Sequence, residues 1–143
     1  MRVSAQSSRG LDRGGRALAL PAATEMNDLH VVVVEDEPIL REEIAAFLRE
    51  SGCTVHEAYC AEQATAICRA GVRVDVLFTD IHLNGSANGW DVAKLFRAAH
   101  PDIGVVYTSG KSLDPAQCVP DSLFFSKPYS RADILTACRR LLA

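Results

Sequence analysis

The sequence predicts an α/β fold, a doubly wound parallel sheet of five strands with helices on both faces. From residue 29 onward, short apolar runs alternate with longer segments whose apolar residues recur at helical spacing. The apolar runs are nearly continuous and rich in β-branched residues, which is typical of strands buried on both faces. Strands that alternate with helices imply right-handed crossovers and parallel pairing, with helices on both sides of the sheet.

The first strand and helix of this pattern have the clearest boundaries. Residues 31–34 are four consecutive valines, and Pro38 favours the first position of a following helix. Apolar residues at helical spacing continue this helix until Gly52, a residue that commonly follows a helix end. The pattern then predicts a strand at residues 54–58, a helix at residues 61–70 and a strand at residues 74–79.

The second half of the chain repeats the alternation. Residues 89–99 predict a helix, in which Val92, Leu95 and Phe96 share one face. Ser130 begins the last helix, and Asp133 stands where the acidic partner of a capping box is expected. The remaining strands are expected at residues 103–107 and 123–126.

The segment between the last two strands is predicted to hold a short, irregular or absent fourth helix. Asp114 can cap a helix whose first residue is Pro115, whereas Pro120 disfavours helical geometry at the residue before it. Little more than one turn, residues 115–118, then remains, and a single turn buries little surface.

Five strands in this arrangement match the flavodoxin-like order 2-1-3-4-5, which is taken from known sheets of this kind rather than from the residues. In such sheets, ligands bind at the carboxyl ends of the strands, near the point where the strand order reverses. Residues that directly follow the predicted strands are therefore the candidates for function.

Composition is that of an ordinary globular protein with one domain. Of 143 residues, 48% are hydrophobic and 23% are charged, with a net charge of −3. Residues 1–25 hold four arginines and two acids, a net +2, which leaves −5 for residues 26–143. We expect residues 1–28 to be a disordered basic tail, or an artefact of a start upstream of Met26, and residues 29–143 to be the domain. Its acidic charge suits a divalent cation or a basic partner, so direct DNA binding is not expected.

Cysteine usage indicates a reducing compartment. An odd count of five, without paired C-x-x-C spacing, argues against a disulfide framework or a zinc site, so a cytoplasmic location is expected. No apolar run approaches the roughly 20 residues of a membrane span, and no membrane association is expected. The cysteines stand at positions 53, 60, 68, 118 and 138.

Polar residues with complementary chemistry follow the predicted strands. Glu35, Asp36 and Asp80 are expected to meet at one edge of the sheet, where three carboxylates repel one another unless a cation neutralises them. A set of oxygen ligands suits Mg²⁺. Lys127 and the Thr108 hydroxyl could contact phosphate oxygens. A carboxylate beside a metal ion, an ammonium group and a hydroxyl has the groups needed to form an aspartyl phosphate.

Four segments resemble the signatures of the response-regulator receiver family, in order and at suitable spacing: VVVVEDEP, LFTDIHL, VVYTSG and FFSKPYS. The resemblance covers about residues 30–143 and implies a receiver domain of a two-component phosphorelay. It implies that Glu35 and Asp36 hold Mg²⁺ together with Asp80, the phosphoacceptor. The phosphoryl donor would be a histidine kinase or a phosphotransfer protein. Thr108 would follow the phosphoryl group, and Lys127 would pair with it.

Several positions depart from the commoner family pattern, among them Asn84, where a proline is common. Glu35 stands where many members have Asp, and Phe124 occupies the place of the switch aromatic without a tyrosine hydroxyl. His82, two residues past Asp80, is a candidate modulator of dephosphorylation. Because the last predicted helix ends at Ala143, we expect a single-domain regulator that signals by docking to a downstream protein. It is expected to assist its own phosphorylation and dephosphorylation, not to be a metabolic enzyme.

Three alternatives compete with a phosphorylated receiver. A degenerate receiver would bind partners without phosphorylation, although Asp36, Asp80, Thr108 and Lys127 are all present. A haloacid-dehalogenase-like hydrolase needs a D-x-D pattern at the nucleophile, and here His82 takes the second acidic position. A flavin carrier is disfavoured because the acidic turn after the first strand would repel the flavin phosphate.

Overall fold

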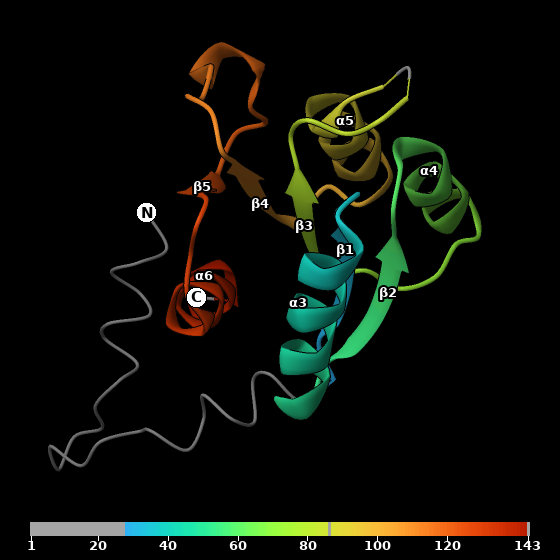
Figure 1. Cartoon of the computed structure of the whole chain (residues 1–143). Helices are drawn as coiled ribbons and strands as arrows, with labels where there is room; N and C mark the ends of the chain where they lie inside the picture. The colour runs from blue at the N-terminus through green and yellow to red at the C-terminus, as the bar shows by residue number, and fades with distance from the viewer. Residues whose placement is uncertain (1–27, 86, 143) are drawn as a thin grey trace, which may run out of the picture.

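The computed structural model describes residues 28–85 and 87–142 and contains one five-stranded parallel sheet (Figure 1). The strands lie in the order β2-β1-β3-β4-β5, and each neighbouring pair is parallel. The predicted fold class and strand order are therefore confirmed. The strands are β1 His30–Val34, β2 Thr54–Ala58, β3 Val76–Asp80, β4 Gly104–Ser109 and β5 Ser122–Ser126.

Four α-helices connect or follow the strands among the described residues. None of these helices has the length and apolar character of a membrane span. The predicted disordered tail, residues 1–28, lies outside the described residues apart from Asp28. The helices are α3 Pro38–Glu50, α4 Ala61–Arg69, α5 Gly89–Ala99 and α6 Arg131–Leu142.

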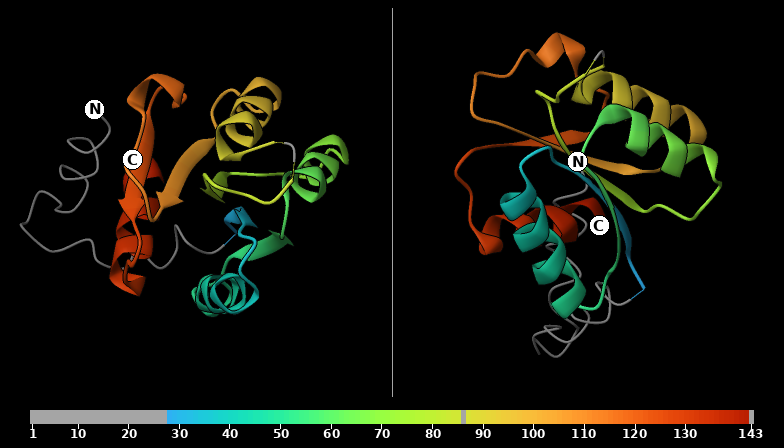
Figure 2. Two further views of the ribbon diagram at one scale, coloured as in Figure 1. Left: turned by 45° about the horizontal axis from the view of Figure 1, so that its top comes forward. Right: turned by 45° about the vertical axis from the view of Figure 1, so that its right-hand side comes forward.

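The helices cover the sheet in two pairs, with α3 and α6 on one face and α4 and α5 on the other (Figure 2). Alternate valines of β1 separate accordingly, because successive strand residues point to opposite faces. Val31 and Val33 pack with α3 and α6, whereas Val32 and Val34 pack with α4 and α5. All four are at most 1% exposed, as the continuous valine run predicts.

The connection between β4 and β5 contains only a single turn of 3₁₀ helix, η1 Pro115–Gln117. The Asp114 side chain caps it by accepting a hydrogen bond from the backbone N–H of Ala116 at 3.1 Å. None of the residues of η1 is buried. The prediction of a short fourth helix that begins at Pro115 is confirmed.

Several predicted boundaries need small corrections. Asp80 is the last residue of β3, and Thr108 and Ser109 lie within β4, so these polar residues extend the ladder and do not follow it. Asp80 pairs with Thr108, and Ser109 pairs with Ser126, so the parallel hydrogen-bond pattern continues through these polar residues. The predicted capping box of α6 is present, since the Ser130 N–H donates to Asp133 and the Asp133 N–H to Ser130.

Candidate active site at the carboxyl edge of the sheet

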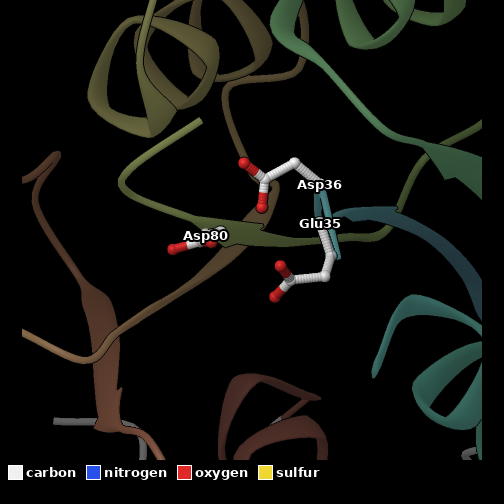
Figure 3. Close-up of side chains that lie close together, drawn as sticks. All are labelled: Glu35, Asp36 and Asp80. Carbon is white, nitrogen blue, oxygen red and sulfur yellow. The ribbon is translucent and has the colours of Figure 1, made fainter. Parts of the chain in front are cut away.

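Three carboxylates meet where β1 and β3 end. Glu35 and Asp36 directly follow β1, and Asp80 closes β3. One carboxylate oxygen from each lies within 4.8 Å of those from the other two, and the three side chains gather beside the strand ends in Figure 3. Because β1 and β3 are parallel neighbours, their carboxyl ends must lie side by side, and the predicted convergence of the three acids is observed.

Lys127 joins this cluster from the end of β5. Its Nζ atom donates to Glu35 Oε1 at 2.9 Å and lies 3.2 Å from Asp80 Oδ2. Its backbone N–H donates to the Ser109 carbonyl at 2.8 Å, which holds the end of β5 against β4. The Lys127–Pro128 peptide bond is cis. One ammonium group thus bridges two carboxylates that lie 45 residues apart in the chain, Glu35 and Asp80.

The electrostatics of the cluster are unbalanced toward negative charge. The pKa of Glu35 is raised from 4.5 to about 7, mainly by burial; the hydrogen bond from Lys127 opposes this shift, and the charge of Asp80 adds to it. Burial alone lowers the pKa of Lys127, but its hydrogen bond with Glu35 and the charges of Glu35 and Asp80 leave it above its ordinary value. One lysine does not neutralise three carboxylates, and an additional cation would be bound favourably.

The donor set fits a hard divalent cation. All three candidate ligands offer oxygen, and Asp36 is half-exposed, whereas Glu35 and Asp80 are buried. Mg²⁺ prefers one or two carboxylates together with waters and phosphate oxygens, and does not require a closed protein cage. Two buried carboxylates and a third that is partly exposed to solvent meet that requirement.

The backbone around Asp80 is held in place by close contacts. The His82 N–H donates to Asp80 Oδ1 at 3.3 Å, and Gly89 N–H donates to the Ile81 carbonyl at 2.8 Å. A Cβ added at Gly89 would collide with the Asp80 carbonyl oxygen and lie 2.8 Å from the Ile81 Cα. Glycine at position 89 therefore allows α5 to begin directly against the strand end that presents Asp80.

The sequence patterns assigned no role to two residues that also lie at the site. Arg41 Nη1 donates to the Glu35 carbonyl at 3.0 Å, and the Tyr129 hydroxyl is buried close to the Thr108 side chain. The close approach of Gly89 was missed as well. The sequence signals were weak, because Gly89 was interpreted only as a helix start and Tyr129 only as part of the motif around Lys127.

The remaining predicted residues lie at different distances from the carboxylates. Thr108 pairs with Asp80 in the register of β3 and β4, and it is 1% exposed. His82 is exposed, and its ring stands edge-on to that of Trp90 with centroids 6.4 Å apart. Phe124 on β5 pairs with Tyr107 on β4 and packs against the core on the side of α4 and α5. It therefore does not line the carboxylate cluster.

Comparison with known proteins identifies the family. The model of the response regulator receiver domain matches residues 31–139. The chain belongs to this family. As a receiver domain of two-component response regulators, it is of the kind that interacts with histidine kinases or phosphotransfer proteins.

Two solved receiver structures and one curated relative illustrate the similarity. A response regulator receiver protein from Sinorhizobium medicae WSM419 is 28% identical, with a TM-score of 0.77 over 80% of this chain and 94% of that chain. The receiver domain of the hybrid histidine kinase CckA is 25% identical, with a TM-score of 0.70 over 80% of this chain and 99% of that chain. The sensor kinase CckA of Brucella abortus (strain 2308) is 31% identical over 117 residues, which are 78% of this chain.

The curated relatives are longer than this receiver domain. The alignment spans 12% of the Brucella sensor kinase and 57% of the alkaline phosphatase synthesis regulator SphR of Synechococcus elongatus. The shared part is thus the receiver domain, and the whole-protein activities of those relatives belong to them.

Proposed function

We propose that this receiver domain accepts a phosphoryl group on Asp80 from a histidine kinase or phosphotransfer protein. The single observation that carries the proposal is the position of the Asp80 carboxylate, which lies 3.2 Å from the Lys127 ammonium and close to Glu35 and Asp36. An anionic carboxylate and an anionic phosphoryl donor repel each other. One fixed cation beside the carboxylate, with room for a second, reduces this repulsion and allows the carboxylate to attack phosphorus.

The transfer step balances as follows. An Asp80 carboxylate oxygen attacks the phosphorus of a phosphohistidine or acetyl phosphate, and a new P–O bond forms. The bond from phosphorus to the donor nitrogen or oxygen breaks, and its electron pair leaves with the imidazole or acetate. Lys127 pairs with a phosphoryl oxygen, and the Thr108 hydroxyl donates to another, so the added charge is shared by groups already at the edge.

Mg²⁺ would be held by Asp36 and Asp80, with Glu35 binding directly or through water. When bound, it would neutralise the carboxylates and the incoming phosphoryl oxygens. Removal of one acid should weaken Mg²⁺ binding while relieving repulsion in the metal-free protein. We expect Asp36→Ala to lose Mg²⁺ affinity and to gain stability without metal, measured by calorimetric titration and by denaturant unfolding. Unchanged affinity in this variant would place the metal elsewhere.

The acceptor is tested by incubation with acetyl phosphate and Mg²⁺. The wild type should gain the mass of one phosphoryl group, and Asp80→Asn should gain none. Asp102→Asn is the matched control, because Asp102 is exposed and precedes β4, at the other end of the strands. Labelling that survives in Asp80→Asn would refute the assignment of the acceptor.

His82 is proposed to modulate dephosphorylation, since its backbone N–H contacts the acceptor carboxylate and its ring rests against Trp90. An imidazole beside an acyl phosphate can position or exclude the attacking water. His82→Ala should change the lifetime of the phosphorylated protein, followed by loss of the phosphoryl mass with time. Equal lifetimes in variant and wild type would leave His82 as an ordinary exposed residue.

Signalling is proposed to occur in the cytoplasm by docking of this domain to a downstream protein, with Thr108 and Phe124 as the switch pair and without direct DNA contact. The competing proposal is a degenerate receiver that docks without phosphorylation. Titration with beryllofluoride and Mg²⁺ discriminates the two, since only a working acceptor site would bind the phosphoryl mimic.

A further inference from the structure

Tyr129 brings a buried hydroxyl to the edge of the candidate site, and none of the roles above uses it. The hydroxyl oxygen is buried and makes no hydrogen bond of ordinary geometry among the described residues. Most buried polar groups are hydrogen-bonded, because one that leaves water without a partner destabilises the fold. The Tyr129 hydroxyl is therefore available to a partner that another state of the site supplies.

The ring of Tyr129 is fixed by its surroundings. It lies two residues after Lys127 and packs against Phe78, with ring centroids 5.8 Å apart and planes inclined at 60°. Phe78 is a core residue of β3, only 1% exposed. Because the anchor strand is the one that ends in Asp80, the hydroxyl end of the ring has a defined position relative to the acceptor.

The groups around the hydroxyl make it a neutral donor. Burial raises the pKa of Tyr129 most, the carboxylates of Glu35, Asp80 and Glu37 raise it further, and the Thr108 side chain is close enough to lower it through a hydrogen bond. The phenol is therefore protonated at neutral pH and has a hydrogen to donate.

Phosphorylation of Asp80 would change the hydrogen bonds that the Thr108 hydroxyl can make. A threonine hydroxyl has one hydrogen and two lone pairs. If that hydrogen is donated to a phosphoryl oxygen on Asp80, the lone pairs remain to accept a hydrogen bond. Thr108 is 1% exposed, so a protein donor must supply it. The Tyr129 hydroxyl is a donor at hand that has no other partner.

We propose that Tyr129 is a positioning residue, whose hydroxyl donates to Thr108 Oγ1 when Asp80 carries a phosphoryl group and so directs the Thr108 hydrogen toward that group. The proposal rests on the proposed function, because it assigns Tyr129 a role only in the phosphorylated state. No proton is transferred in this role. We expect this hydrogen bond to reach ordinary geometry only when the phosphoryl group is present.

The test measures the affinity for beryllofluoride in the presence of Mg²⁺ by NMR titration. Tyr129→Phe removes only the hydroxyl and should weaken binding about tenfold, the effect of losing one hydrogen bond made in the bound state alone. Tyr59→Phe is the matched control, since Tyr59 is 54% exposed, and it should leave the affinity unchanged. Without beryllofluoride, Tyr129→Phe should be at least as stable as the wild type, whereas a purely structural hydroxyl would give a less stable variant with unchanged affinity.

The decisive comparison measures whether the effect of Tyr129→Phe depends on the Thr108 hydroxyl. In the Thr108→Val background, Tyr129→Phe should have no further effect, while in Thr108→Ser, which keeps a hydroxyl, the loss of about tenfold should return. If Tyr129→Phe does not fold, the ¹³Cζ shift of Tyr129 in the otherwise unaltered protein should move on addition of beryllofluoride and remain still in Thr108→Val. A wild type that binds no beryllofluoride overturns the proposed function and this role with it. Normal binding with equal affinity in Tyr129→Phe, or an unmoved ¹³Cζ shift, overturns the role of Tyr129 alone.

Discussion

Two of the connections that leave the carboxyl edge of the sheet are built differently. The one after β3 leads into α5, an eleven-residue helix closed at its start by a capping box between Asn88 and Asp91 and packed on the sheet through Phe96. The one after β4 reaches β5 through η1, a single turn without buried residues. It is anchored by Val119, which is buried in the core, and by two hydrogen bonds. The Val119 N–H donates to the Tyr107 hydroxyl at 3.1 Å, and Arg97 donates to the Pro120 carbonyl at 2.7 Å.

The difference teaches which part of the fold the chemistry needs. Asp80 and Lys127 are held by the sheet and by the start of α5, and neither depends on a fourth helix. The second connection is therefore free to vary without loss of the acceptor site. Since it lies between Thr108 and Phe124, the proposed switch pair, its reduction to one turn should alter the surface that partners meet.

The largest expected difference between the packed helices and the connection from β4 to β5 is in the reactivity of their cysteine thiols. Burial raises the pKa of Cys138 on α6 to about 12, and it also raises that of Cys118 beside η1, which is only partly buried. Because the thiolate is the reactive form, Cys118 should be alkylated about a hundredfold faster than Cys138 at pH 8.5. The rate at Cys118 should rise with pH, while Cys138 stays protected until the protein unfolds. Peptide mass spectrometry after iodoacetamide checks this, and equal rates would contradict the difference in packing.

A methyl group should be tolerated in one connection and not in the other. Gly89→Ala forces α5 away from the Asp80 and Ile81 backbone and should cost about 3 kcal/mol in the free energy of unfolding. Gly110→Ala is the matched control after β4, since a Cβ there meets nothing within 4 Å, and its effect should stay within about 0.5 kcal/mol. Denaturant unfolding measures both, and similar losses would show that the two connections are equally packed.

The hydrogen bond between Tyr107 and Val119, which holds the connection from β4 to β5, can be tested by one substitution. Tyr107→Phe leaves the Val119 N–H without its acceptor, and we expect a loss of about 1–2 kcal/mol, with faster hydrogen exchange at Val119. Tyr59→Phe, an exposed tyrosine, serves as the control. Unchanged exchange at Val119 would show that other contacts hold the segment.

Loss of the η1 cap should have the smallest effect. Asp114→Ala removes the hydrogen bond to Ala116 and should cost about 0.5–1 kcal/mol, since the turn is exposed. The rate of phosphorylation by acetyl phosphate should change by no more than about twofold. A severalfold slower rate would mean that the turn supports the acceptor site after all.

Much of this architecture was predictable because it follows from local patterns. The apolar runs gave the five strands, Pro115 and Pro120 limited the fourth helix, and Glu35 had to meet Asp80 once β1 and β3 were neighbours. The close approach of Gly89, the Arg41 contact and the buried Tyr129 hydroxyl depend on how elements distant in sequence pack together. No residue pattern within one element specifies such distances, so sequence reasoning did not find them.

The most direct measurement locates the phosphoryl group itself. Borohydride reduces an aspartyl phosphate to homoserine, and peptide mass spectrometry then reports which position was modified. After acetyl phosphate and Mg²⁺, homoserine should appear at position 80, both in the wild type and in Asp114→Ala. Homoserine at position 36, or an unmodified Asp80 in protein that carries a phosphoryl group, would contradict the proposal that Asp80 is the acceptor.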